Sequence, residues 1–215
     1  MGVGGWEPEC SMMNDECRMA QGRVDVVLAS ASPRRRELLG LIFSEFRVIP
    51  SDFDESNVPG DLPPAEHVIY SASVKARELA GRYPESLVIG ADTVVVVDNA
   101  ILGKPADAED AARMLRMLSG RVHQVYTGIA VARDGVERSA FESTDVRFRP
   151  LTDELICRYI ATGEPMDKAG AYAIQGRGSA LIESIEGCYF NVVGLPIHRL
   201  SVVLQEFGIA PLADG

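Results

Sequence analysis

The segment from Leu87 to Val97 constrains the fold of this chain more than any other, because it is apolar except for Asp92 and Thr93. Its first part, Leu87 to Ala91, is typical of a strand that is buried on both faces of a sheet. A carboxylate in these surroundings must be paired with a cation, bound to a metal, or placed where a strand breaks at a cleft. An aspartate that caps a turn is a weaker alternative, since the turn Asp98-Asn99 comes six positions later. We therefore expect the buried strand to end near Asp92 and this carboxylate to carry a function.

A second strand end indicates anion binding. The apolar run from Val24 to Ala29 predicts a strand, and Ser30-Ala31-Ser32-Pro33-Arg34-Arg35-Arg36 then leads into a helix with Pro33 in its first turn. Unpaired backbone N–H groups and the helix dipole favour an anion at such a turn. Arginine adds donors whose geometry matches phosphate. The turn therefore predicts a phosphate site, with a solvated arginine-rich face as the alternative.

Helices and strands alternate along the rest of the chain. Apolar residues at helical spacing predict helices over 64–82 and 107–118, from Thr152 to near Thr162, and over 196–207. Residues 122–132 and 136–148 are typical of a hairpin, because Asp134-Gly135 is a strong turn signal. Short strands are expected at 46–50, 171–174, 180–185 and 189–193. This order favours an α/β fold with a mixed sheet.

Composition limits the classes of function. A formal net charge of −10 argues against a broad nucleic-acid-binding surface, although a small anion can bind in a locally basic pocket. No apolar run reaches the roughly 18 residues that a membrane span needs, and no secretory signal is recognised. Residues 1–22 are expected to be a disordered extension and residues 23–210 a single domain. We therefore expect a cytoplasmic protein with neither a nucleic acid polymer nor a membrane as partner.

Other predicted strands are also followed by charged residues, Asp54-Glu55 and Gly103-Lys104-Pro105, and the stretch Asp167–Gly176 is a further polar site. Ligands of open α/β sheets bind outside the strand ends, so these groups and the two described above are expected to share one cleft. Carboxylate oxygens bind Mg²⁺ or Mn²⁺, and lysine and arginine bind phosphate oxygens. This set of acidic and basic residues fits a site that binds a divalent cation together with a polyphosphate.

Six segments, in this order, resemble the Maf family of nucleoside triphosphate pyrophosphatases: Ser30–Arg35, Gly90–Thr93, Gly103–Pro105, His123–Gly128, Asp167–Tyr172 with Ile174–Gly176, and Asn191–Pro196. The resemblance implies two α/β lobes around a long twisted mixed β-sheet with a central cleft, similar to the inosine triphosphate pyrophosphatase fold. It also implies a nucleoside triphosphate substrate that is cleaved between its α and β phosphates, a divalent metal cation (Mg or Mn), and a possible homodimer in the cytoplasm.

The resemblance also assigns roles to residues. Asp92 matches the family's catalytic aspartate, described as the proton acceptor. Arg34, Thr93 and Gln175 match positions used for substrate choice, and together they are similar to the branch that acts on dTTP and UTP. The branch that acts on 7-methyl-GTP has an acidic residue in place of Gln175.

Charged pocket positions of the family are matched by Glu55, Lys75 and Lys104. The full expected site has Ser32, Arg34, Lys75, Thr93, Lys104, Lys168 and Gln175 binding the substrate, and Glu55 and Asp92 holding the metal. Arg35 and Arg36 are interpreted as surface or helix-face charges.

Several alternatives stay open. Asp92 can act as the base or only as a metal ligand, and Lys168 can simply pair with Asp167 or Glu164. His123 is interpreted as a structural hydrogen-bonding group. The substrates can extend to modified pyrimidine nucleotides. A different class of function is a nucleotide-binding regulator of septum formation or cell division with little turnover.

Overall fold

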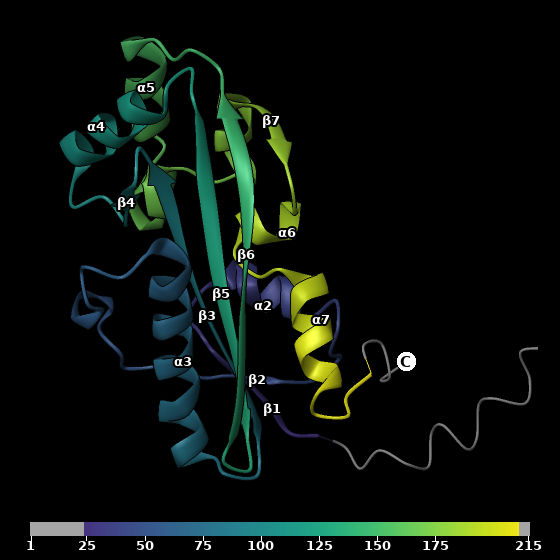
Figure 1. Ribbon diagram of the computed structural model, residues 1–215. Coiled ribbons are helices and arrows are strands. Elements are labelled where there is room, and N and C mark those ends of the chain that lie inside the picture. The colour runs from purple at the N-terminus through teal and green to yellow at the C-terminus, as the bar shows by residue number, and fades with distance from the viewer. Residues whose placement is uncertain (1–23, 211–215) are drawn as a thin grey trace, which may run out of the picture.

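One mixed sheet forms the centre of residues 24–210, the part of the chain that the computed structural model describes (Figure 1). The predicted disorder of residues 1–22 lies outside this range. Seven strands are hydrogen-bonded in the order β2-β1-β3-β5-β6-β7, with β4 beside β3. The strands are β1 (Val26–Ala29), β2 (Arg47–Val48), β3 (Leu87–Val97), β4 (Ala100–Leu102), β5 (Val122–Arg133), β6 (Val136–Phe148) and β7 (Ile182–Glu186). β1 pairs in parallel with β2 and β3 and the other pairs are antiparallel, which confirms the mixed sheet.

The hairpin of β5 and β6 gives the sheet its length. Its turn residues Asp134 and Gly135 have φ of 52° and 76°, as the favoured two-residue hairpin turn requires. β3 pairs with β5 along nine consecutive residue pairs, from Val88–Ala132 to Val96–Gln124. Three long strands therefore run side by side through the described fold (Figure 1).

Helices cover the sheet in two groups, which are the two predicted lobes (Figure 1). At the end where β1 and β2 lie, α3 covers one face and α2 and α7 the other, whereas α4 and α5 lie at the opposite end. The α-helices are α2 (Pro33–Leu39), α3 (Pro64–Arg82), α4 (Ala108–Leu118), α5 (Asp153–Ile160), α6 (Tyr189–Val193) and α7 (Ile197–Gln205). None of the helices within residues 24–210 is both long and apolar enough to cross a membrane.

Side-chain alternation along β3 separates the hydrophobic clusters on the two faces. Val88 packs with Ala72 and Ala76 of α3. Its neighbour Ile89 faces the other way and joins the cluster that contains residues of α2 and α7. Further along the strand, Val95 belongs to the cluster of α4 and α5 in the second lobe. One strand thus contributes to the cores of both lobes.

Helix α3 packs unusually close to β3, because Gly90 lacks a side chain. A Cβ atom at Gly90 would lie 2.2 Å from the backbone oxygen of Ala72 and 2.9 Å from the backbone nitrogen of Ala76. Both distances are far shorter than a van der Waals contact. The close approach places Lys75, which lies between these helix residues, directly over the centre of β3.

Three predictions about strands are wrong. β3 does not end at Asp92 but continues to Val97, because Asp92 and Thr93 keep their pairing with β5. Residues 189–193 form the short helix α6 rather than a strand, and the Val192 and Gly194 amides make helical hydrogen bonds to the backbone oxygens of Cys188 and Phe190. Residues 171–174 also form no strand, since short 3₁₀ helices occupy Ala169–Ala171 and Gly176–Leu181.

We predict that Gly90→Ala lowers the free energy of unfolding by about 2 kcal/mol or more, because the added methyl group meets helix backbone that cannot rotate away. Gly81→Ala is the matched control on α3, where a Cβ atom would meet nothing within 4 Å. It should leave the stability unchanged or raise it by about 1 kcal/mol. Urea unfolding of the three proteins measures both effects, and equal destabilisation by the two substitutions would contradict the close-packing argument.

Candidate functional site

A gap in the sheet beside β3 creates the site. β1 pairs with β3 only as far as the Ala29–Gly90 pair, and β4 pairs with β3 only from Val95 onward. Between them, residues 91–94 of β3 pair with β5 but with no second strand among residues 24–210. Asp92 therefore lies in the middle of a strand, yet it borders open space. This explains how a carboxylate is tolerated in a buried apolar strand.

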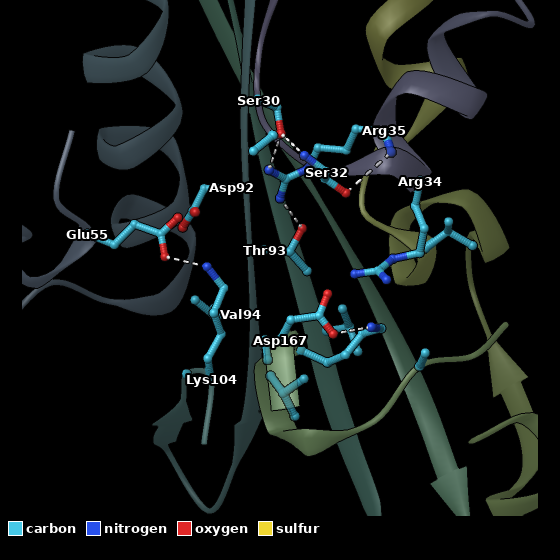
Figure 2. A pocket seen from close by; sticks show the side chains of 18 of the residues that line it. Ser30, Ser32, Arg34, Arg35, Glu55, Asp92, Thr93, Val94, Lys104 and Asp167 are labelled. Atoms are coloured by element: carbon cyan, nitrogen blue, oxygen red, sulfur yellow. Dashed lines mark hydrogen bonds and ion pairs between the residues drawn. The ribbon is translucent and has the colours of Figure 1, made fainter. Parts of the chain in front are cut away.

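The gap opens into a pocket of about 580 Å³, within the range of small-molecule sites. All five segments that the sequence singled out contribute to its wall, so the prediction of one shared cleft is confirmed. The expected site residues that line it are Ser32, Arg34, Glu55, Lys75, Asp92, Thr93, Lys104, Lys168 and Gln175. Figure 2 shows Glu55 and Lys104 on one side of this pocket and Arg34 on the other.

Lys75 holds two carboxylates at the centre of the site. Its Nζ atom donates to Asp92 Oδ1 and to Glu55 Oε1, at 2.8 Å in each case. Lys75 is 6% exposed and Asp92 5%, so this ion pair is almost completely removed from water. A buried charge is stable only when it is paired and hydrogen-bonded, and each of these two residues provides that for the other.

Glu55 extends the charge cluster toward solvent. It lies in the short 3₁₀ helix Glu55–Asn57, and its Oε2 atom is 3.6 Å from the exposed ammonium group of Lys104. Burial alone would raise the pKa of Glu55, but the charge and hydrogen bond of Lys75, with the charges of Lys104 and Arg35, lower it to about 2. Glu55 is therefore ionised at neutral pH.

The carboxylates around Lys75 can supply only some of the ligands that a divalent cation needs. Two carboxylates, from Glu55 and Asp92, converge on one ammonium group. No group of three or more His, Cys, Asp or Glu side chains that could hold a metal occurs in residues 24–210. Magnesium is often held by one or two carboxylates together with phosphate oxygens and water. The pair is thus compatible with a cation whose remaining ligands come from a phosphorylated substrate.

Arg35 is not a surface charge, and the prediction that it points away from the site is wrong. Its guanidinium donates to the backbone oxygens of Gly194 (2.9 Å) and Ala91 (3.0 Å), and to the hydroxyl groups of Ser30 (3.2 Å) and Thr93 (3.0 Å). The local sequence pattern could not predict these contacts, because β3 and the Gly194 loop are brought within reach of Arg35 only by the fold. Arg35 connects three separate segments at the gap in the sheet.

Thr93 belongs to a chain of partly buried hydroxyl groups in which the donor of each hydrogen bond can be identified. Thr127 Oγ1 donates to the backbone oxygen of Asn191 (2.9 Å), so the 2.9 Å contact between Thr93 and Thr127 must use the hydrogen of Thr93. Thr93 in turn accepts from Arg35. Its hydroxyl hydrogen is therefore committed within the protein.

Lys168 and Ser32, two further residues of the pocket wall, also have partners within the protein. Lys168 forms an ion pair with Asp167, which is the pairing that the sequence left open. Burial would raise the pKa of Asp167, but the hydrogen bond and charge of Lys168 and the charge of Arg34 lower it. Ser32 accepts from the Arg35 amide at 3.4 Å and so caps α2, while its own hydrogen stays available to a ligand.

His123 lies behind the pocket wall. Its Nε2 atom is 2.7 Å from the hydroxyl oxygen of Tyr172, which lines the pocket, and burial lowers the pKa of the imidazole to about 4. His123 is thus uncharged at neutral pH. This agrees with its interpretation as a structural hydrogen-bonding group.

The mixed sheet and a pocket walled by both carboxylates and cations define an α/β protein with a site for a phosphorylated ligand. A family model described as Maf-like protein matches residues 25–207, so the chain belongs to the Maf family.

Relatives of this chain include proteins named dTTP/UTP pyrophosphatase. One from Pelotomaculum thermopropionicum is 54% identical and covers 86% of this chain and 97% of its own length. Another, from Symbiobacterium thermophilum, is 55% identical over 88% of this chain and 97% of its own length. Among solved structures, a HAM1 protein from Coxiella burnetii aligns with 86% of this chain and 100% of its own, with a TM-score of 0.44 and 17% identity.

We predict that the stability supplied by Glu55 depends on pH in a defined window. The folded-state pKa of about 2 lies below the ordinary value of 4.5, so the stabilisation is complete above pH 4.5 and is lost as the pH falls toward 2. Glu55→Gln should therefore be less stable than the wild type at pH 6, and the difference should shrink toward pH 2. Urea midpoints measure this, with Glu183→Gln, an exposed position, as the control. A difference that is independent of pH would contradict the pairing.

Proposed function

We propose that this chain is a nucleoside triphosphate pyrophosphatase that hydrolyses dTTP and UTP to the monophosphate and pyrophosphate, and whose substrates can extend to modified pyrimidine nucleotides. The observation that carries the proposal is one pocket in which the buried carboxylate of Asp92 faces cations from four separate segments: Arg34, Lys75, Lys104 and Lys168. Relatives about 54–55% identical over most of the chain are named for this activity, which supports it.

In the proposed reaction, Asp92 accepts the proton from the water that attacks the α phosphorus. Lys75 pairs with Asp92 and fixes the orientation of its carboxylate through the 2.8 Å hydrogen bond. Lys104 and Arg34 border the pocket from opposite sides, so they can neutralise the charge that develops on the departing pyrophosphate (Figure 2). Ser32 and Lys168 contribute further donors to the phosphate groups.

We also propose that Glu55 and Asp92 hold a Mg²⁺ or Mn²⁺ ion when the triphosphate is bound. Such an ion would neutralise the phosphate oxygens. Lys75 contacts one oxygen of each carboxylate. The ion would therefore either replace the Lys75 ammonium group at these carboxylates or bind beside it. A possible homodimer and a cytoplasmic location, which the resemblance implies, stay predictions.

Base choice is assigned to Gln175, Arg34 and Thr93. An amide offers both a donor and an acceptor, as the O4 and N3–H groups of uracil and thymine require. Because the hydroxyl hydrogen of Thr93 is directed to Thr127, Thr93 acts in this scheme by holding Arg35 and shaping the wall, rather than by donating to the substrate.

We predict that the purified protein with Mg²⁺ or Mn²⁺ releases pyrophosphate from dTTP and UTP, and that EDTA stops the release. Asp92→Asn should lower the rate by about a hundredfold or more, because an amide cannot accept the proton. Asp61→Asn, an exposed position, is the matched control. No release from any nucleoside triphosphate would refute the proposed activity. A cellular effect that persists in Asp92→Asn would instead favour the nucleotide-binding regulator.

We predict that Gln175→Glu lowers kcat/KM for UTP and dTTP about tenfold, because a carboxylate accepts hydrogen bonds but cannot donate to O4. A nucleotide panel measures the change, with Gln205→Glu at an exposed position as the control. An unchanged order of preference across the panel would place Gln175 outside the base-binding region.

A further inference from the structure

Gln175 lies on a segment that has no strand or α-helix to hold it. It follows the 3₁₀ helix Ala169–Ala171 and directly precedes the 3₁₀ helix Gly176–Leu181. A side chain that selects a ligand must be held to within roughly 0.5 Å, and irregular segments reach that precision only when their backbone groups are bonded to fixed partners. The partners of this segment therefore bear on the choice of base.

Two side chains outside the pocket hold the backbone on either side of Gln175. The hydroxyl group of Tyr159 accepts a hydrogen bond from the Ala173 amide at 3.2 Å. The carboxylate of Glu164 accepts from the Arg177 amide at 3.0 Å and from the Gly178 amide at 2.9 Å. The amides two residues before Gln175, and two and three residues after it, are thus anchored.

The two anchors are joined to each other. The Tyr159 hydroxyl group donates to Glu164 Oε1 at 2.9 Å, so one hydrogen-bonded unit spans the segment that carries Gln175. Tyr159 is 4% exposed and packs in the hydrophobic cluster of the second lobe, which gives the unit a rigid base. Burial would raise the pKa of Glu164, but the Arg177 and Gly178 amides and the Tyr159 hydroxyl lower it, so the carboxylate is ionised and accepts from all three.

The backbone at Gly176, next to Gln175, passes close to the carboxylate of Glu164. Gly176 has φ of 74°, and a Cβ atom there would lie only 2.7 Å from Glu164 Oε2. The glycine permits both the left-handed conformation and the close approach of the carboxylate. Neither Tyr159 nor Glu164 belongs to the residues that line the pocket.

We propose that Glu164 and Tyr159 are positioning residues that set nucleobase selectivity by holding the segment of Gln175 against the pocket. This proposal rests on the proposed function, because it deepens the base choice assigned to Gln175. The hydrogen bonds of Glu164 go to Tyr159, Arg177 and Gly178, and none of them goes to Lys75 or Asp92. Its effect should therefore fall on base discrimination and KM rather than on the chemical step.

The test compares UTP with CTP, which differ in the base edge that Gln175 would face. Glu164→Gln leaves only one acceptor oxygen where two are used, so at least one anchored amide loses its partner. We expect the ratio of kcat/KM for UTP over CTP to fall about tenfold, through KM, with kcat for UTP changed less than about threefold. Tyr159→Phe should shift the ratio in the same direction and keeps the buried ring. Glu154→Gln, on the exposed surface of α5, is the control.

A double-substitution cycle separates positioning from general stability. If Glu164 acts through Gln175, Glu164→Gln should change the UTP/CTP ratio less than about twofold in a Gln175→Ala background. An unchanged ratio in both single variants, equal loss with UTP and CTP, or additive effects with Gln175→Ala would each overturn the proposal. A wild-type protein that releases no pyrophosphate would overturn the proposed activity instead. In that case, the dissociation constants of UTP and CTP are measured in the Asp92→Asn protein with and without Glu164→Gln. The change in their ratio then tests the positioning role of Glu164 separately.

Discussion

The ammonium group of Lys75, buried between Asp92 and Glu55, is the interaction on which the site depends. Removing one partner of a buried ion pair typically costs about 3–5 kcal/mol, because the remaining charge is left without compensation. The pair can form only because α3 lies against β3 at Gly90, where a side chain would hold the helix away. The close packing of α3 at Gly90 therefore also places the charged groups of the pocket.

The gap in the sheet turns this ion pair into an accessible site. A complete sheet would cover residues 91–94 of β3 with a neighbouring strand, as it does on the β5 side. Arg35 compensates for the missing strand by donating to Ala91, and it also binds Thr93 and Gly194. The edge thus keeps part of its hydrogen bonding while the centre stays open to a ligand. On the opposite side of β3 from the gap, the uninterrupted β3–β5 ladder joins the two lobes.

The segment to which we assign base choice is held in place differently from the region around Asp92. Asp92 lies on a long strand and Lys75 on a long helix, so secondary structure fixes the positions of these two residues. Around Gln175, irregular backbone is held by Glu164 and Tyr159 from behind the pocket wall. A surface loop is more easily altered than a central strand. In the proposed scheme, this arrangement would allow base choice to change while the region around Asp92 is retained.

Local sequence patterns were sufficient for most elements and for the five segments that line the pocket. Periodicity and the Asp134-Gly135 turn predicted the helices and the long hairpin, since these depend on interactions between residues near in sequence. The unusual carboxylate of Asp92 marked the functional strand for the same reason, as its surroundings are its sequence neighbours.

What only the tertiary structure decided was which groups meet. Asp92 borders a cleft without ending its strand, because β1 and β4 leave a gap that no local pattern encodes. Arg35 and Glu164 gained their roles from partners far away in sequence, Gly194 and Thr93 for the first and the segment beyond Gln175 for the second. Hydrogen bonds of charged side chains depend on distances set by the packing of whole elements, and these distances are not present in the order of residues alone.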